Sequence, residues 1–85
     1  MKQVEIYTSP ICGFCVRAKR LLDAKGVAYV ERDIFAEPDA RAEMMQRAEG
    51  RRTVPQIFID GVGIGGCDEL FALERAGRLD PMLAA

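Results

Sequence analysis

An Asp-Gly pair at residues 60–61 constrains the fold of this chain more than any other feature, because it separates two short strand-like runs. The run before it, residues 56–59, is almost continuously apolar, which is typical of a strand covered on both faces. The run after it covers residues 62–64. An Asp-Gly step between such runs predicts a tight β-hairpin, so the two strands are expected to be antiparallel.

The first half of the chain has a different pattern, in which a helix separates two strands. Residues 3–7 and 28–34 are strand-like. Between them, apolar residues recur at helical spacing after Cys12, and Gly26 is typical of a helix C-terminus. A strand–helix–strand unit has parallel strands and a right-handed crossover. Together with the antiparallel hairpin, this unit predicts a mixed sheet.

Two further helices complete the prediction. One begins at Pro38, which suits the first position of a helix, and is closed by Gly50; the other opens at residues 68–69 and ends at Gly77. The predicted order is β-α-β-α-β-β-α, an α/β fold with a four-stranded mixed sheet and three helices on its faces. The short chain has no repeat or linker, so residues 1–85 are expected to form one domain.

The charge balance argues against several function classes. Twelve basic and thirteen acidic residues give a net charge of -1, so nothing in the composition indicates a nucleic-acid partner or a membrane surface. No apolar run approaches the ~20 residues needed to cross a bilayer. The chain passes from Met1 into a strand-like segment without a signal-peptide pattern, which predicts a cytoplasmic location.

The cysteine and histidine content narrows the chemistry further. The chain has three cysteines and no histidine, which excludes a zinc site with mixed Cys and His ligands and a His-based nucleophilic triad. Three cysteines are also one short of an all-cysteine tetrahedral site in a monomer. The cysteines are therefore redox-active, ligands in an assembly, or buried packing residues.

Cys12 and Cys15 form a Cys-x-x-Cys motif directly after a strand and at the start of a helix. Such a context favours a redox site over two cysteines that merely pack. At a helix N-terminus, backbone N–H groups and the helix dipole favour the thiolate of Cys12. Cys15 lies one turn along the same face, so Cys12 is predicted to attack and Cys15 to resolve. Phe14, between them, either packs or shields the thiolate from water.

With these motifs, the sequence resembles the glutaredoxin family over nearly its whole length. The likeness rests on residues 4–8, the Cys-x-x-Cys motif, residues 53–59 and residues 65–70. The resemblance implies a thioredoxin-like fold and a glutathione-dependent oxidoreductase that reduces glutathione mixed disulfides and protein disulfides. Its expected partners are glutathione and glutathionylated or disulfide-bonded proteins.

The resemblance also implies where glutathione binds. A segment with Pro55 in cis is expected to face the active cysteine and to leave the Val54 backbone free to pair with the cysteine of glutathione. The turn that precedes the last helix is expected to receive the γ-glutamyl carboxylate, with Asp68 binding the ammonium or capping the helix. Cys67 is expected to be a small buried residue. The implied binding residues are Phe14, Arg41, Thr53, Val54, Pro55, Gly66, Cys67 and Asp68.

Two departures from the family pattern bear on function. Many members have a lysine where this chain has Ser9, so another cation must meet the glycine carboxylate of glutathione; Arg41 is the first candidate and Arg52 the second, although both also suit a solvated surface. The Gly13-Phe14 dipeptide is typical of the monothiol branch, which binds [2Fe–2S] clusters. The alternative function is therefore a cluster carrier or sensor, in which two subunits share a [2Fe–2S] cluster through Cys12 and two glutathiones. In the absence of a cluster, the protein is expected to be a monomer.

Overall fold

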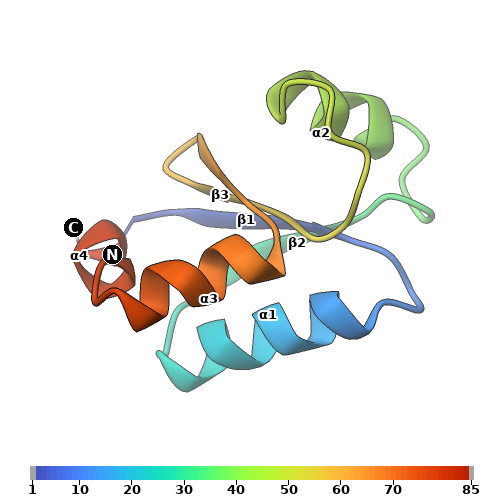
Figure 1. Cartoon of the computed structure of the whole chain (residues 1–85). Coiled ribbons are helices and arrows are strands. Elements are labelled where there is room, and N and C mark those ends of the chain that lie inside the picture. Colours follow the sequence, from blue (N-terminus) through green and yellow to red (C-terminus); the bar gives the residue numbers. More distant parts are fainter. Residues whose placement is uncertain (1, 85) are drawn as a thin grey trace.

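A four-stranded sheet forms the centre of the computed structural model, which describes residues 2–84; Met1 and Ala85, the ends of the predicted domain, lie outside the described residues. Helices cover both faces of this sheet (Figure 1). The strands are β1 (Val4–Thr8), β2 (Tyr29–Asp33), β3 (Gln56–Ile59) and β4 (Val62–Gly65). The helices are α1 (Gly13–Ala24), α2 (Ala40–Arg47), α3 (Cys67–Arg75) and α4 (Leu79–Leu83).

The sheet is mixed, as the sequence predicts, and its strand order is β2-β1-β3-β4. β1 pairs with β2 in parallel and with β3 antiparallel, and β3 pairs with β4 antiparallel. Asp60 and Gly61 have φ angles of 52° and 82°. Two successive residues with positive φ give the twist that a tight hairpin requires, so the predicted hairpin is confirmed.

The two faces of the sheet carry separate apolar clusters because successive side chains of a strand point to opposite faces. Ile6 and Ile57 belong to the cluster that packs against α1 and α3, whereas Tyr7 and Phe58 belong to the cluster under α2. Figure 1 shows α1 and α3 on one side of the sheet and α2 on the other. The site described below lies where the C-terminal end of β1 meets the start of α1.

The start of α2 differs from the prediction. The helix begins at Ala40, and Pro38 lies in the turn before it. The Asp33 carboxylate accepts the backbone N–H groups of Phe35 and Ala36 at 2.8 and 3.2 Å. This side-chain bonding holds the segment after β2 in turns, so helical bonding starts later than the proline signal indicates.

The prediction of three helices was short by one, because α4 (Leu79–Leu83) follows α3. Leu79 and Leu83 are buried in the cluster under α1 and α3, and the backbone N–H of Lys2 donates to the carbonyl of Leu83 at 3.0 Å. Pro81 lies in the first turn of α4, where its missing N–H removes no helical bond. The helix is thus fixed by packing and not by a sequence signal.

A cluster of charged side chains fastens α2 to the sheet. Arg47 donates to both carboxylate oxygens of Glu5 at 2.9 and 3.0 Å, and its guanidinium lies 4.1 Å from the centre of the Phe58 ring. The Tyr7 hydroxyl accepts a bond from Arg47 and donates one to Glu43. The Arg47 bonds hold the pKa of Glu5 below its ordinary value. This anchoring matters to the site, because the loop that leaves α2 leads to Pro55.

We expect Arg47→Ala to lower the free energy of unfolding by about 1–3 kcal/mol, through loss of a two-pronged ion pair and a cation–π contact. Urea unfolding would measure this, with the exposed Arg75→Ala as the matched control, expected to change stability by about 0.5 kcal/mol or less. Since the folded pKa of Glu5 is lowered from 4.5, this contribution is present above that pH and is lost as pH falls through the folded pKa. A difference between wild type and variant that persists unchanged in acid would contradict the ion-pair explanation.

Candidate active site

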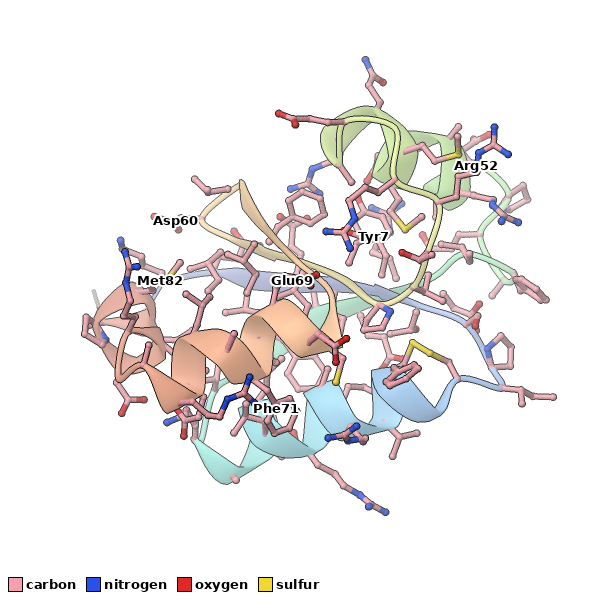
Figure 2. All side chains as sticks on the ribbon, viewed as in Figure 1. Tyr7, Arg52, Asp60, Glu69, Phe71 and Met82 are labelled. Carbon is pink, nitrogen blue, oxygen red and sulfur yellow. A yellow bond between two sulfur atoms is a disulfide. The ribbon has the colours of Figure 1, made fainter. Side chains whose placement is uncertain are left out.

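Cys12 and Cys15 lie at the N-terminus of α1 and form a disulfide, which is drawn as a yellow bond in Figure 2. Their Cα atoms are 5.2 Å apart, within the usual range for a disulfide. Cys15 is 1% exposed, whereas Cys12 is partly exposed. An incoming thiol or disulfide can therefore reach the sulfur of Cys12 and not that of Cys15.

Cys12 is the N-cap of α1. Its backbone is extended, with φ of -147° and ψ of 100°, and its Sγ accepts the backbone N–H of Cys15 at 3.0 Å. An N-cap side chain that accepts an amide of the first turn lies at the positive end of the helix dipole. An N–H donor and the positive end of the dipole therefore both face the Cys12 sulfur.

The segment with Pro55 lies directly beside Cys12. The Val54–Pro55 peptide bond is cis, as the resemblance implied. The carbonyl oxygen of Val54 is 3.9 Å from Cys12 Sγ. Gln56, at the start of β3, is buried, and its amide donates to the carbonyl and the hydroxyl of Thr53 at 3.0 and 3.3 Å. β3 thus holds this loop in place through the Gln56 side chain, for which the sequence pattern predicts only a place in a strand.

A pocket of about 240 Å³ runs from this segment to the start of α3. Seven of the eight residues implied to bind glutathione line it, although they come from three separate parts of the chain. Arg41 is not among the lining residues, and neither is Arg52, while Arg51 and Glu69 are. The seven are Phe14, Thr53, Val54, Pro55, Gly66, Cys67 and Asp68.

Larger pockets lie along β4, but neither Phe14 nor the cis-proline segment is among their described lining residues. Cys12 and Cys15 are not among the described lining residues of the pocket at α3. Their neighbours Phe14 and Val54 are, and the Val54 carbonyl oxygen is 3.9 Å from Cys12 Sγ, so this pocket lies next to the redox pair. Phe14 forms part of its wall and is 56% exposed. This position agrees with a side chain that covers the site rather than one that packs in the core.

Gly66 lies where two segments approach closely. A Cβ atom at this position would lie 3.0 Å from the carbonyl oxygen of Pro55, a contact so tight that the two segments would have to separate by a few tenths of an ångström. Glycine therefore lets the start of α3 lie against the cis-proline segment. This packing brings the backbone N–H groups of α3 to the edge of the pocket, where they can attract a carboxylate.

Two carboxylates and one arginine set the charge at this end of the pocket. Oε1 of Glu69 accepts the backbone N–H of Gly66 at 2.6 Å and lies 3.2 Å from the Arg51 guanidinium. The Gly66 N–H is the main cause that lowers the pKa of Glu69 from its ordinary value. Asp68 lies beside them in the pocket wall.

Sequence reasoning had not singled out Arg51, Gln56 or Glu69. Glu69 carries a signal, because an acidic residue three positions after the residue that starts a helix often bonds back to that residue. Gln56 is the one polar side chain in an otherwise apolar run. Arg51 carries no local signal that separates it from Arg52.

The third cysteine, Cys67, is free and only 4% exposed. Burial raises the pKa of its thiol, so the protonated form is favoured.

Within residues 2–84, no group of three or more Cys, Asp or Glu side chains is placed to hold a metal ion. None of the helices described has the length and apolar character needed to cross a membrane.

Comparison with known proteins gives consistent matches. The glutaredoxin family model matches residues 4–64. Glutaredoxin 3 of Escherichia coli is 54% identical over 83 residues, covering 98% of this chain and 99% of that protein. The crystal structure of a buckwheat glutaredoxin–glutathione complex is similar with a TM-score of 0.87 and 38% identity, covering 96% of this chain and 76% of that one. A solved structure described as "Metal Binding of Glutaredoxins" has a TM-score of 0.73 and 53% identity, covering 98% and 89%.

Proposed function

The chain belongs to the glutaredoxin family of thiol–disulfide oxidoreductases, and from this premise we propose that glutathione is its reductant and that Cys12 is its nucleophile. One observation carries the proposal: the N-capping sulfur of Cys12 lies 3.9 Å from the carbonyl oxygen of Val54, which lines a pocket that ends at the start of α3. The buckwheat relative was solved with glutathione bound, which supports the same ligand here.

The proposed binding mode uses the backbone at both ends of the pocket. The N–H and C=O of Val54 pair with the cysteine of glutathione, whose sulfur then meets Cys12. The N–H groups at the start of α3 receive the α-carboxylate of the γ-glutamyl end, and Asp68 accepts its ammonium. The first of these contacts is supported by the 3.9 Å between Cys12 Sγ and the Val54 carbonyl oxygen.

In the proposed monothiol cycle, the Cys12 thiolate attacks the glutathione sulfur of a mixed disulfide. The original S–S bond breaks, the partner leaves as a thiolate that takes up a proton, and Cys12 becomes bonded to glutathione. A second glutathione thiolate then attacks the glutathione sulfur of this intermediate, which releases glutathione disulfide and the Cys12 thiolate. The N–H of Cys15 stabilises that leaving thiolate, and a stable leaving group speeds the exchange.

In the proposed dithiol cycle, Cys12 first forms a mixed disulfide with a substrate protein. The Cys15 thiolate then attacks Cys12 Sγ, so the Cys12–Cys15 disulfide forms and the substrate leaves reduced. Two glutathiones restore the dithiol and become glutathione disulfide. The product of this route is a Cys12–Cys15 disulfide, and the structure contains that bond.

The direct test is turnover of a small glutathione mixed disulfide, coupled through glutathione reductase to NADPH consumption. We expect turnover that depends on glutathione concentration. Replacement of glutathione by a monothiol without the γ-glutamyl group is the matched control, and it is expected to support slower turnover. Negligible turnover by the folded protein would overturn the proposed function.

The second candidate function is binding of a [2Fe–2S] cluster, favoured by Gly13-Phe14 and by the relative described for its metal binding. Such a cluster takes four thiolates, and the described residues of one chain hold no set of ligands for it. Four thiolates for one cluster would therefore have to come from Cys12 of two chains and from two glutathiones. Anaerobic reconstitution with iron, sulfide and glutathione is expected to give a coloured dimer, and a colourless monomer would contradict this function.

A further inference from the structure

Arg51 is the one basic side chain among the described residues that line the pocket. It lies at the end formed by the start of α3, where its guanidinium is 3.2 Å from Glu69 Oε1. The same end carries the carboxylates of Asp68 and Glu69. Figure 2 shows Glu69 at the start of α3 and Arg52 on the α2 side of the molecule.

The charge at this end is unfavourable for a carboxylate ligand unless an arginine offsets it. The dipole of α3 supplies only about half a positive charge, and two side-chain carboxylates face the same space. In addition, the Gly66 N–H already donates to Glu69 at 2.6 Å. Without Arg51, the α-carboxylate of a γ-glutamyl group would lie next to Asp68 and Glu69 with no basic side chain among the described lining residues.

The geometry of Arg51 leaves it free to bind a second carboxylate. A guanidinium has five N–H donors in a rigid fork, and one of its nitrogens contacts Glu69. The two side chains are 48% and 44% exposed, so their mutual attraction is weakened by water. The contact with Glu69 thus keeps the guanidinium at the start of α3 and leaves its other donors available to a ligand.

We propose that Arg51 binds the α-carboxylate at the γ-glutamyl end of glutathione and selects γ-glutamyl thiols over thiols that lack this group. The inference rests on the proposed function and adds to it the residue that sets this preference. Arg51 then serves the opposite end of the ligand from the glycine carboxylate, for which Arg41 and Arg52 remain the predicted candidates.

The test compares three small mixed disulfides, made with glutathione, with γ-glutamylcysteine and with cysteinylglycine. The rate constant for reaction of each with the reduced protein is measured by stopped flow. We expect Arg51→Ala to slow the first two reactions about tenfold, the size of one charge-assisted contact at a partly exposed site. The cysteinylglycine reaction is expected to be unchanged, because that compound lacks the γ-glutamyl carboxylate.

Two further variants sharpen the comparison. Arg51→Lys is expected to restore part of the lost rate, since it keeps the charge without the fork. Arg20→Ala removes one exposed positive charge from α1, outside the pocket, and is expected to leave all three rates unchanged. It controls for the change in net charge.

The possible outcomes distinguish a failure of the Arg51 assignment from a failure of the proposed function. Equal slowing of all three reactions, or none, would overturn the inference while the proposed function stands. Slowing with glutathione and cysteinylglycine alone would also overturn it, because it would place Arg51 at the glycine end. A folded wild-type protein that reacts with none of the three would overturn the proposed function and the inference together.

Discussion

Cys12→Ser is expected to lower turnover of a glutathione mixed disulfide at least about a thousandfold, as is typical when a covalent nucleophile is removed. A serine hydroxyl is not ionised at neutral pH, and no other sulfur takes over, because Cys15 is 1% exposed and Cys67 is 4% exposed. The effect is measured with the NADPH-coupled assay at saturating glutathione.

The folded state of the Cys12→Ser protein is checked in the same samples, with wild type reduced in parallel. Thermal unfolding is the suitable control, since Cys12 is partly exposed and serine preserves its N-cap role. Substantial turnover by the folded variant would show that a different group attacks the substrate. The assignment of Cys12 as nucleophile would then be wrong.

Cys15→Ser is expected to separate the two proposed cycles. The variant keeps the N–H that donates to Cys12 Sγ at 3.0 Å, so reduction of a glutathione mixed disulfide should stay within about threefold of wild type. Reduction of a protein disulfide is expected to fall about a hundredfold or more, because the mixed disulfide with the substrate loses its intramolecular attacking thiol. Insulin disulfide reduction measures the second activity.

The ratio of the two activities is the informative quantity for Cys15→Ser. A loss of similar size in both assays would show that Cys15 acts in the monothiol cycle or supports the fold of the site. In that case the division of roles between Cys12 and Cys15 would be wrong. Retention of both activities would show that glutathione alone resolves the protein mixed disulfide.

The sequence by itself determined those structural features that residues close together in the chain form with one another. Asp60 and Gly61 adopt two successive positive φ angles because these residue types tolerate them, and the hairpin follows. Cys12 caps α1 and lies within disulfide distance of Cys15 because a separation of three residues is close to one helical turn. Local geometry and side-chain chemistry are sufficient for each of these predictions.

Other features arise from contacts between residues far apart in the chain. Val54 and Cys12 are 42 positions apart, and only the pairing of β1 with β3 brings them together. The strand order and the helix α4 depend on such packing as well. The sequence motifs identified which segments serve the site, but not how closely they meet.

The clearest example is the pair of adjacent arginines at residues 51–52, which are equivalent in the sequence. The fold places Arg51 in the pocket beside Glu69 and leaves Arg52 outside its lining. Likewise, only the tertiary structure shows that a Cβ atom at residue 66 would crowd the Pro55 carbonyl oxygen, at 3.0 Å. The sequence determined the reactive pair and its chemistry, whereas the tertiary structure decided which charges face the ligand, because packing fixes where each segment of the chain lies.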